Sequence, residues 1–318
     1  AYAAAVAVQA LGEKPESVEV NVSANIIKNV KSVVVPCTGG LRGIGAAVCA
    51  GIVAGCPEKE LEILEEITGE QKVEMKKMLD TMPMTIRESD KEYIFDIQIK
   101  ACAGGHSGYV EIAGFHTNVI CVKKDDEIIR EKAYEEQGSS CATDRSLLTV
   151  EKIIEFADCV DVADVEEVLQ RQIDYNWAIA EEGMTGKWGA AIGKTLMEAY
   201  GNSVHNRAKA MAAAGSDARM NGCELPVVIN SGSGNQGMTT SLPVIVYAKE
   251  LNVSKEMMLR ALVVSNLITI HMKTGSGRLS AYCGAISAGC GAGAGICYLY
   301  GGRAYEISHV IVNAVAIN

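Results

Sequence analysis

The stretch that decides the fold runs over residues 92–132 and contains YIFDIQIKAC (93–102), GYVEIAGFHTNVICVKK (108–124) and EIIREK (127–132). Apolar and polar residues alternate along each segment, as in β-strands that bury one face. A Gly-Gly pair and an Asp-Asp pair separate the segments, and such pairs are typical of tight turns between antiparallel strands. The pattern therefore predicts an antiparallel β-meander.

The residues before the meander predict a mixture of helices and strands. The Ala-rich residues 1–11 predict a helix that ends at Gly12, and SVEVNVSANIIKNVKSVVVP (17–36) predicts two strands. CTGGLRGIGAAVCAGIVAG (37–55) predicts a turn that leads into an apolar helix, where free backbone N–H groups suit an anion such as a carboxylate. Two short charged helices follow, the first opened by Pro57 and the second capped by Thr68.

The pattern changes after the polar, turn-rich stretch EEQGSSCATD (135–144). Helical spacing recurs beyond it, and helices are predicted at 164–182, 189–200, 206–220, 238–251 and 255–272. Asp164 is the predicted cap of the first, Gly183 its predicted stop, and Ser254 the predicted cap of the last. The sequence therefore predicts an α+β protein, with a mixed α/β domain at 1–135 that contains the antiparallel meander and a mainly α-helical domain at 145–318.

Composition narrows the class of protein. The 318 residues carry a net charge of −10, which argues against a nucleic-acid-binding surface and favours small-molecule partners. Eleven cysteines without a small secreted pattern argue against a disulfide framework and favour a reducing cytoplasm. Residues 279–302 are uncharged but rich in Gly, Ser, Cys and Tyr, so a buried helix is favoured over a membrane span.

The densest polar segment is NSGSGNQG (230–237), which follows an apolar run and precedes a predicted helix. Backbone N–H groups at a helix start suit a carboxylate, and amide side chains suit an amino group, so the segment is a candidate site for an α-amino acid. A glycine-rich connector is the structural alternative. Lys273 follows a predicted buried helix. It could pair with a substrate carboxylate, and a solvated charge at the helix C-terminus is an equal alternative. The candidate substrate-binding residues here are Ser231, Ser233, Asn235, Gln236 and Lys273.

Three cysteines recur at intervals of seven in AYCGAISAGCGAGAGICYLY (281–300): Cys283, Cys290 and Cys297. On a helix the outer two would stand roughly 21 Å apart, so one small metal site cannot use all three. Gly289 and Gly291 flank Cys290 and would leave room for a bulky iron–sulfur cluster. The alternative is a helix that packs through small residues, with inert buried thiols.

Three long segments closely resemble the bacterial and archaeal L-cysteine desulfidases, which belong with the alpha chain of iron–sulfur L-serine dehydratases. The segments are NIIKNVKSVVVPCTGGLRGI (25–44), NRAKAMAAAGSDARMNGCELPVVINSGSGNQGMTTSLPVIVYAKEL (206–251) and ALVVSNLITIHMKTGSGRLSAYCGAISAGCGAGAGICYL (261–299). The resemblance implies a [4Fe–4S] cluster and a β-elimination on L-cysteine that gives sulfide, ammonia and pyruvate. L-serine dehydration and a non-catalytic, amino-acid-binding relative are the alternatives.

The resemblance also implies roles for single residues. Cys290 matches a cluster cysteine of the family, Cys283 is the weaker candidate ligand, and Asn25 joins the residues expected to orient the amino acid. A Gly-Cys-Thr-Glu-Pro motif expected before Ala1 and a Cys-Asp-Gly-Ala-Lys motif expected after Asn318 are missing. Both ends are therefore expected to be truncated, the cluster to be incomplete or absent in this chain, and the base and remaining ligands to lie outside it. The expected partners are L-cysteine or L-serine, with no nucleic acid and no membrane; a homodimer is one arrangement that the sequence leaves open.

Overall fold

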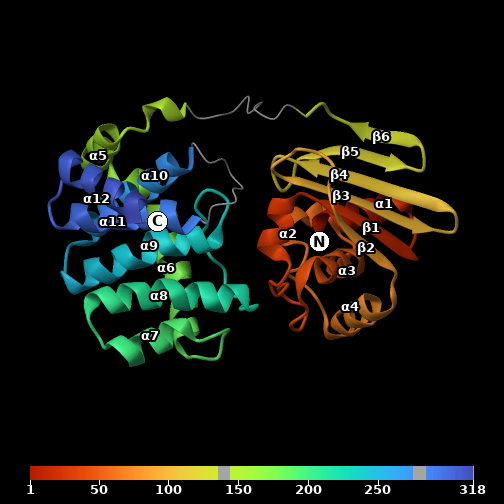
Figure 1. The fold of residues 1–318 in the computed structure, drawn as a ribbon, viewed down its shortest axis with the longest axis horizontal. Coiled ribbons are helices and arrows are strands. Elements are labelled where there is room, and N and C mark those ends of the chain that lie inside the picture. The colour runs from red at the N-terminus through yellow and green to blue at the C-terminus, as the bar shows by residue number, and fades with distance from the viewer. Residues whose placement is uncertain (135–143, 275–283, 318) are drawn as a thin grey trace. The chain divides into compact units, whose positions relative to one another are not determined.

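The computed structural model describes residues 1–134, 144–274 and 284–317. Contacts within the chain group it into two units, Ala1–Ser140 and Cys141–Asn318 (Figure 1). The first unit combines helices with a six-stranded sheet, and the described part of the second contains only helices as regular structure. The predicted α+β class is confirmed.

The sheet of the first unit has the strand order β2-β1-β3-β4-β5-β6. β1 and β2 pair in parallel, and every other neighbouring pair is antiparallel, so the predicted meander is confirmed as β3 to β6. The strands are β1 (Ser17–Val22), β2 (Met84–Glu88), β3 (Asp96–Ala103), β4 (His106–Ala113), β5 (Val119–Lys124) and β6 (Glu127–Glu131).

Helix α1 (Tyr2–Leu11) packs on one face of this sheet, against β3, β4 and β5. Val20, Ile99 and Val110 occupy paired positions on neighbouring strands of that face and are at most 3% exposed. Gly108 allows the close approach of α1, because an added Cβ would lie 2.1 Å from the carbonyl oxygen of Ala7. The core of the first unit therefore lies between α1 and the sheet.

The remaining helices of the first unit correct two predictions. Only residues 17–22 of the stretch 17–36 form a strand. Ser23 takes the N-cap position of helix α2 (Ala24–Val30), and Val34 forms no more than an isolated bridge with Arg42. The segment at Pro57 is a short 3-10 helix, η1 (Pro57–Glu62), interrupted at Glu60. The helix after the Gly-rich turn is α3 (Gly43–Ala54), and α4 (Gly69–Thr81) begins with the predicted Thr68 cap.

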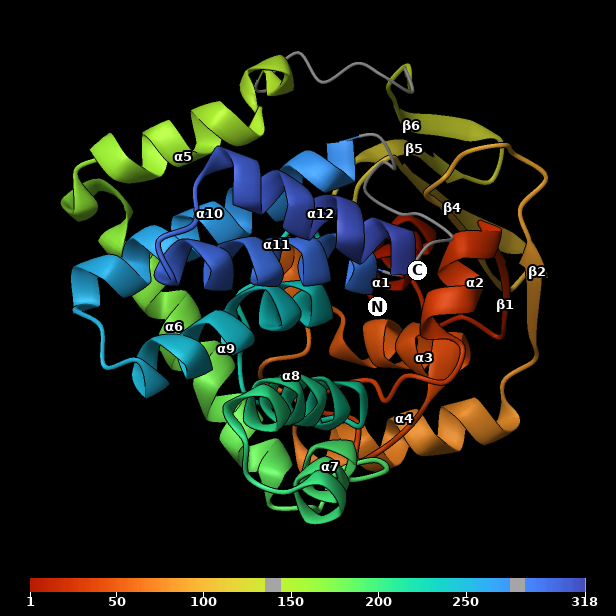
Figure 2. The same ribbon diagram turned by 60° about the vertical axis from the view of Figure 1, so that its left-hand side comes forward.

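The second unit is built around helix α9. Figures 1 and 2 show α7, α8, α9, α11 and α12 in successive layers, and the helices that follow one another in this order contact each other. The described helices are η2 (Arg145–Leu147), α5 (Val150–Cys159), α6 (Val162–Met184), α7 (Ile192–Tyr200), α8 (Val204–Met220), α9 (Gly234–Glu250), α10 (Lys255–Thr274), α11 (Gly284–Leu299) and α12 (Ala304–Ile317). Across the described ranges, no helix combines the length and apolarity needed to cross a membrane.

The start and end of α6 differ from the prediction. Asp161, and not Asp164, caps the helix by accepting a hydrogen bond from the N–H of Ala163 at 3.1 Å. Gly183 lies inside the helix and does not end it. An added Cβ at Gly183 would lie 2.1 Å from the carbonyl oxygen of Ala214, so this glycine permits α6 and α8 to cross closely. The predicted Ser254 cap of α10 is confirmed.

Candidate functional site

The loop that precedes α9 forms a tight, strained turn. Asn230 and Ser233 exchange two backbone hydrogen bonds of 3.1 Å, and Ser231 between them has a φ of 48°. Non-glycine residues seldom adopt positive φ, and such strain persists where the surroundings fix the backbone. Ser233 then caps α9, because its hydroxyl accepts a hydrogen bond from the N–H of Gln236. The turn therefore fixes the first N–H groups of α9 in one direction.

Buried amide side chains hold this turn against α6 and α10. Asn230 donates to Asn266 Oδ1 at 2.9 Å, and its own Oδ1 accepts from Ser231 Oγ at 3.0 Å and from Gln236 Nε2 at 3.3 Å. Asn266 and Gln172 hydrogen-bond each other through both amide groups. A network of buried hydrogen bonds of this kind rigidifies a polar site inside a core.

One atom of the network lacks a partner among the residues that the structure describes. Oε1 of Gln236 accepts no hydrogen bond from them, and the side chain is only 2% exposed. A buried acceptor left unpaired costs about 1–3 kcal/mol, so such atoms in native proteins point to an absent partner. The first residue of α11, Gly284, lies against this atom, because an added Cβ would be 2.2 Å from Oε1. The N-termini of α9 and α11 therefore meet at Gln236.

A guanidinium flanks the same helix start. Arg219, in the last turn of α8, donates to Asn235 Oδ1 at 3.1 Å and lies against Gly234. No ion pair joins it to a carboxylate within the ranges that the structure describes, and burial lowers the pKa of the guanidinium below its usual value. A partly buried cation beside the N-terminus of α9 forms a positive site that suits a carboxylate. Sequence reasoning missed Arg219; its only signal was its place shortly before the polar loop.

Helix spacing relates Lys273 to this site. Thr240 of α9 and Thr269 of α10 hydrogen-bond each other at 3.0 Å, and a four-residue connection makes the two helices antiparallel neighbours. Gln236 lies one turn before Thr240, and Lys273 lies one turn after Thr269, on the same helix faces. Lys273 is 6% exposed. The structure therefore places Lys273 on the face of α10 that contacts α9, at the level of Gln236.

Two predicted site residues lie outside the described part of the second unit. Asn25 lies in α2 of the first unit and is half-buried, whereas Ser231, Ser233, Asn235 and Gln236 belong to the second unit. Cys283 lies outside the described residues. The described contacts thus bring together the four loop residues, with Arg219 added and Lys273 nearby.

The surroundings of Cys290 do not fit an iron–sulfur cluster. Its side chain is 0% exposed and belongs to an apolar core that includes Leu262 and Ile268, and burial raises the pKa of the thiol, which disfavours the thiolate that binds metal. Residues 1–134, 144–274 and 284–317 contain no group of three or more His, Cys, Asp or Glu side chains placed to bind a metal. Gly291 packs against α10, since an added Cβ would lie 2.0 Å from Thr269 Oγ1. The glycine therefore makes room for a helix.

Together the loop and its neighbours suit a zwitterion. The first N–H groups of α9 and the Arg219 guanidinium are donors for a carboxylate, and Gln236 Oε1 is a buried acceptor for an ammonium group. The rest of the site consists of hydroxyl and amide groups held in place by hydrogen bonds. An α-amino acid carries both charged groups on one carbon, which matches this pairing.

Comparison with known proteins identifies one family for this chain. Residues 58–318 match the serine dehydratase alpha chain family. The chain is 56% identical over 317 residues to the UPF0597 protein DSY1109 of Desulfitobacterium hafniense, covering 100% of this chain and 74% of that protein. It is 49% identical over 319 residues to a UPF0597 protein of Lachnoclostridium phytofermentans, covering 99% and 76% of the two chains. No solved structure matches. The chain therefore belongs to the serine dehydratase alpha chain family.

Proposed function

We propose that this chain binds and orients the substrate of a lyase that performs β-elimination on an α-amino acid, with L-cysteine as substrate and L-serine as the alternative. Family membership supports a serine dehydratase-like lyase. The observation that carries the proposal is the unpaired, buried Oε1 of Gln236 beside a helix N-terminus that Arg219 flanks.

In this proposal the two ends of the amino acid have different partners. The carboxylate accepts hydrogen bonds from Arg219 and from the first N–H groups of α9, apart from that of Gln236, which donates to Ser233 Oγ. The ammonium group donates to Gln236 Oε1. Lys273, at the level of Gln236 on α10, stays a proposed residue for orienting the amino acid. Fixing the amino acid at both ends holds Cα and Cβ in one orientation, which lowers the entropic part of the activation barrier.

The reaction proposed is L-cysteine plus water giving pyruvate, ammonia and hydrogen sulfide. Loss of the Cα proton and of the β-thiol gives 2-aminoacrylate, and the water added in its hydrolysis releases ammonia. The described residues do not fit a [4Fe–4S] cluster at Cys290, so the roles proposed for them are binding and orientation. Cys283, which the sequence resemblance also names, remains a proposed cluster ligand.

Substrate analogues test the pairing of charges. Calorimetric titration of the anaerobic full-length protein compares L-cysteine with 3-mercaptopropionate, which lacks the amino group, and with cysteamine, which lacks the carboxylate. Each analogue is expected to bind about 10-fold or more weakly, because each leaves a charged hydrogen bond unmade, worth about 1.5–3 kcal/mol. Equal affinity of 3-mercaptopropionate and L-cysteine would contradict a role for Gln236. Turnover of L-cysteine and L-serine under strict anoxia then decides between the two substrates.

A second candidate function is amino-acid binding without turnover. It is favoured by one observation: the group formed by Asn230, Gln236, Asn266 and Gln172 contains amides only, with no described carboxylate or histidine to remove a proton. Tight binding of L-cysteine with no release of pyruvate from the full-length, cluster-reconstituted protein would favour this candidate.

A further inference from the structure

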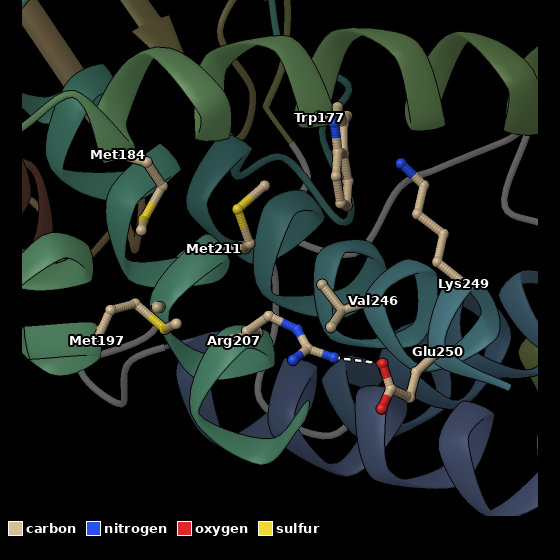
Figure 3. A pocket seen from close by; sticks show the side chains of 9 residues that line it. Trp177, Met184, Met197, Arg207, Met211, Val246, Lys249 and Glu250 are labelled. Atoms are coloured by element: carbon tan, nitrogen blue, oxygen red, sulfur yellow. Dashed lines mark hydrogen bonds and ion pairs between the residues drawn. The ribbon is translucent and has the colours of Figure 1, made fainter. Parts of the chain in front are cut away.

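An apolar cavity lies at the end of α9 that is remote from Gln236. Its volume is about 320 Å³, and its walls come from α6, α7, α8 and α9 (Figure 3). Val246 and Lys249 of α9 line it, whereas Gln236 lies at the start of the same helix. At 1.5 Å per residue, the 13 residues from Gln236 to Lys249 span about 20 Å, so this cavity is separate from the amino-acid site.

The walls of the cavity are apolar and adaptable. Figure 3 shows Met184, Met197 and Met211 with their side chains directed into the space below α6, and Trp177 closing one side. Methionine has three rotatable bonds and a polarizable sulfur, so a pocket with three of them adjusts to apolar groups of different shape. A cavity of this volume is at the lower end of the range for small-molecule sites, which are mostly apolar with a few polar groups.

The rim of the cavity carries an excess positive charge. Arg207 and Glu250 form an ion pair there and cancel each other (Figure 3). The Lys249 ammonium lies 3.3 Å from the centre of the Trp177 ring, and within the described ranges no carboxylate forms an ion pair with it. Partial burial lowers the pKa of the Lys249 ammonium, and the negative charge of Glu181 offsets only part of this effect. Lys249 therefore offers an unneutralised cation at the mouth of an apolar cavity.

We propose that this cavity binds a small monocarboxylate with an apolar body, such as a medium-chain fatty acid. The hydrocarbon lies among the three methionines and Val246, and the carboxylate pairs with Lys249. A free amino acid does not suit the cavity, because its ammonium group would face Lys249 and the apolar walls. The distance from Gln236 excludes contact between the ligand of this cavity and the substrate. A ligand bound here would therefore act as an effector and not as a substrate. The inference does not depend on the proposed lyase activity.

Octanoate, 1-octanol and octylamine separate the apolar and charged parts of the proposal. Titration of the full-length protein, followed by Trp fluorescence and by calorimetry, is expected to show octanoate binding most tightly and octylamine most weakly. Lys249→Met is expected to weaken octanoate binding about 10-fold, equivalent to about 1.4 kcal/mol, because it removes the ion pair with the carboxylate. The affinity for 1-octanol, which has no charge, is expected to stay nearly unchanged. Lys249 is exposed, so this variant is expected to fold normally.

The matched control is Lys209→Met. Lys209 is an exposed lysine on α8 that does not line the cavity, and its replacement changes the net charge by the same amount. It is expected to leave octanoate affinity unchanged. Met211→Trp fills the cavity and is expected to weaken octanoate and 1-octanol together. Failure of octanoate to bind, or equal weakening by the Lys249 and Lys209 variants, would overturn the proposal.

Discussion

Arg219→Met is expected to lower the affinity of the full-length protein for L-cysteine by about 10- to 100-fold. The guanidinium is partly buried beside the N-terminus of α9, has no described carboxylate partner and hydrogen-bonds Asn235. Removing a charged hydrogen bond to a substrate carboxylate costs about 1.5–3 kcal/mol, which corresponds to this change in Kd. Arg219→Lys keeps the charge but loses the planar guanidinium, and is expected to have an intermediate affinity.

The analogue cysteamine separates binding from structure in this variant. Since cysteamine has no carboxylate, its affinity is expected to be the same for the wild type and for Arg219→Met. Arg171→Met is the matched control, because Arg171 is exposed on α6 and pairs only with the exposed Glu167 in the described structure. It is expected to bind L-cysteine normally. An Arg219→Met protein that binds L-cysteine as tightly as the wild type would remove this residue from the site.

Gly291→Ala is expected to destabilise the second unit by about 1–3 kcal/mol or more. The added Cβ would lie 2.0 Å from Thr269 Oγ1 and 2.5 Å from the carbonyl oxygen of Ser265, so α10 and α11 would have to separate. Gly289→Ala, two residues away in the same helix, meets nothing within 4 Å. This control is expected to stabilise the protein by about 0.5–1 kcal/mol, because alanine is the better helix former.

Chemical unfolding of the cluster-free protein measures both glycine variants. Opposite signs for the two substitutions would show that Gly291 serves helix packing and Gly289 does not. A Gly291→Ala protein as stable as the wild type would contradict the packing role and would favour the sequence interpretation, in which both glycines clear space beside Cys290.

Local patterns predicted the regular elements well where one physical rule dominates. The meander from β3 to β6 was visible because a Gly-Gly pair and an Asp-Asp pair mark tight turns between antiparallel strands. The cap at Thr68 was visible because its hydroxyl pairs with the nearby Gln71 N–H. The second strand expected within 17–36 was wrong because tertiary context overrides strand propensity. Ser23 starts α2 in that stretch, and tertiary pairing leaves Val34 with only a bridge.

The candidate site was predictable only in part. The loop of Ser231 to Gln236 was evident from its amides, hydroxyls and glycines before a helix. Arg219 comes from a different helix, and the unpaired state of Gln236 Oε1 depends on how α9 and α11 meet, which no local pattern reveals. The sequence interpretation gave Cys290 free space because glycines flank it. What lies beside those glycines depends on how the helices cross, and atoms of α10 lie beside Gly291.

A crystal structure of the full-length protein with L-alanine bound tests the central claim most directly. L-alanine has the carboxylate and ammonium groups of the substrate but no leaving group at Cβ, so it cannot react. We expect its carboxylate within hydrogen-bond distance of Arg219 and the first N–H groups of α9, with its ammonium on Gln236 Oε1. L-alanine bound elsewhere, with Gln236 Oε1 still unpaired, would contradict the account.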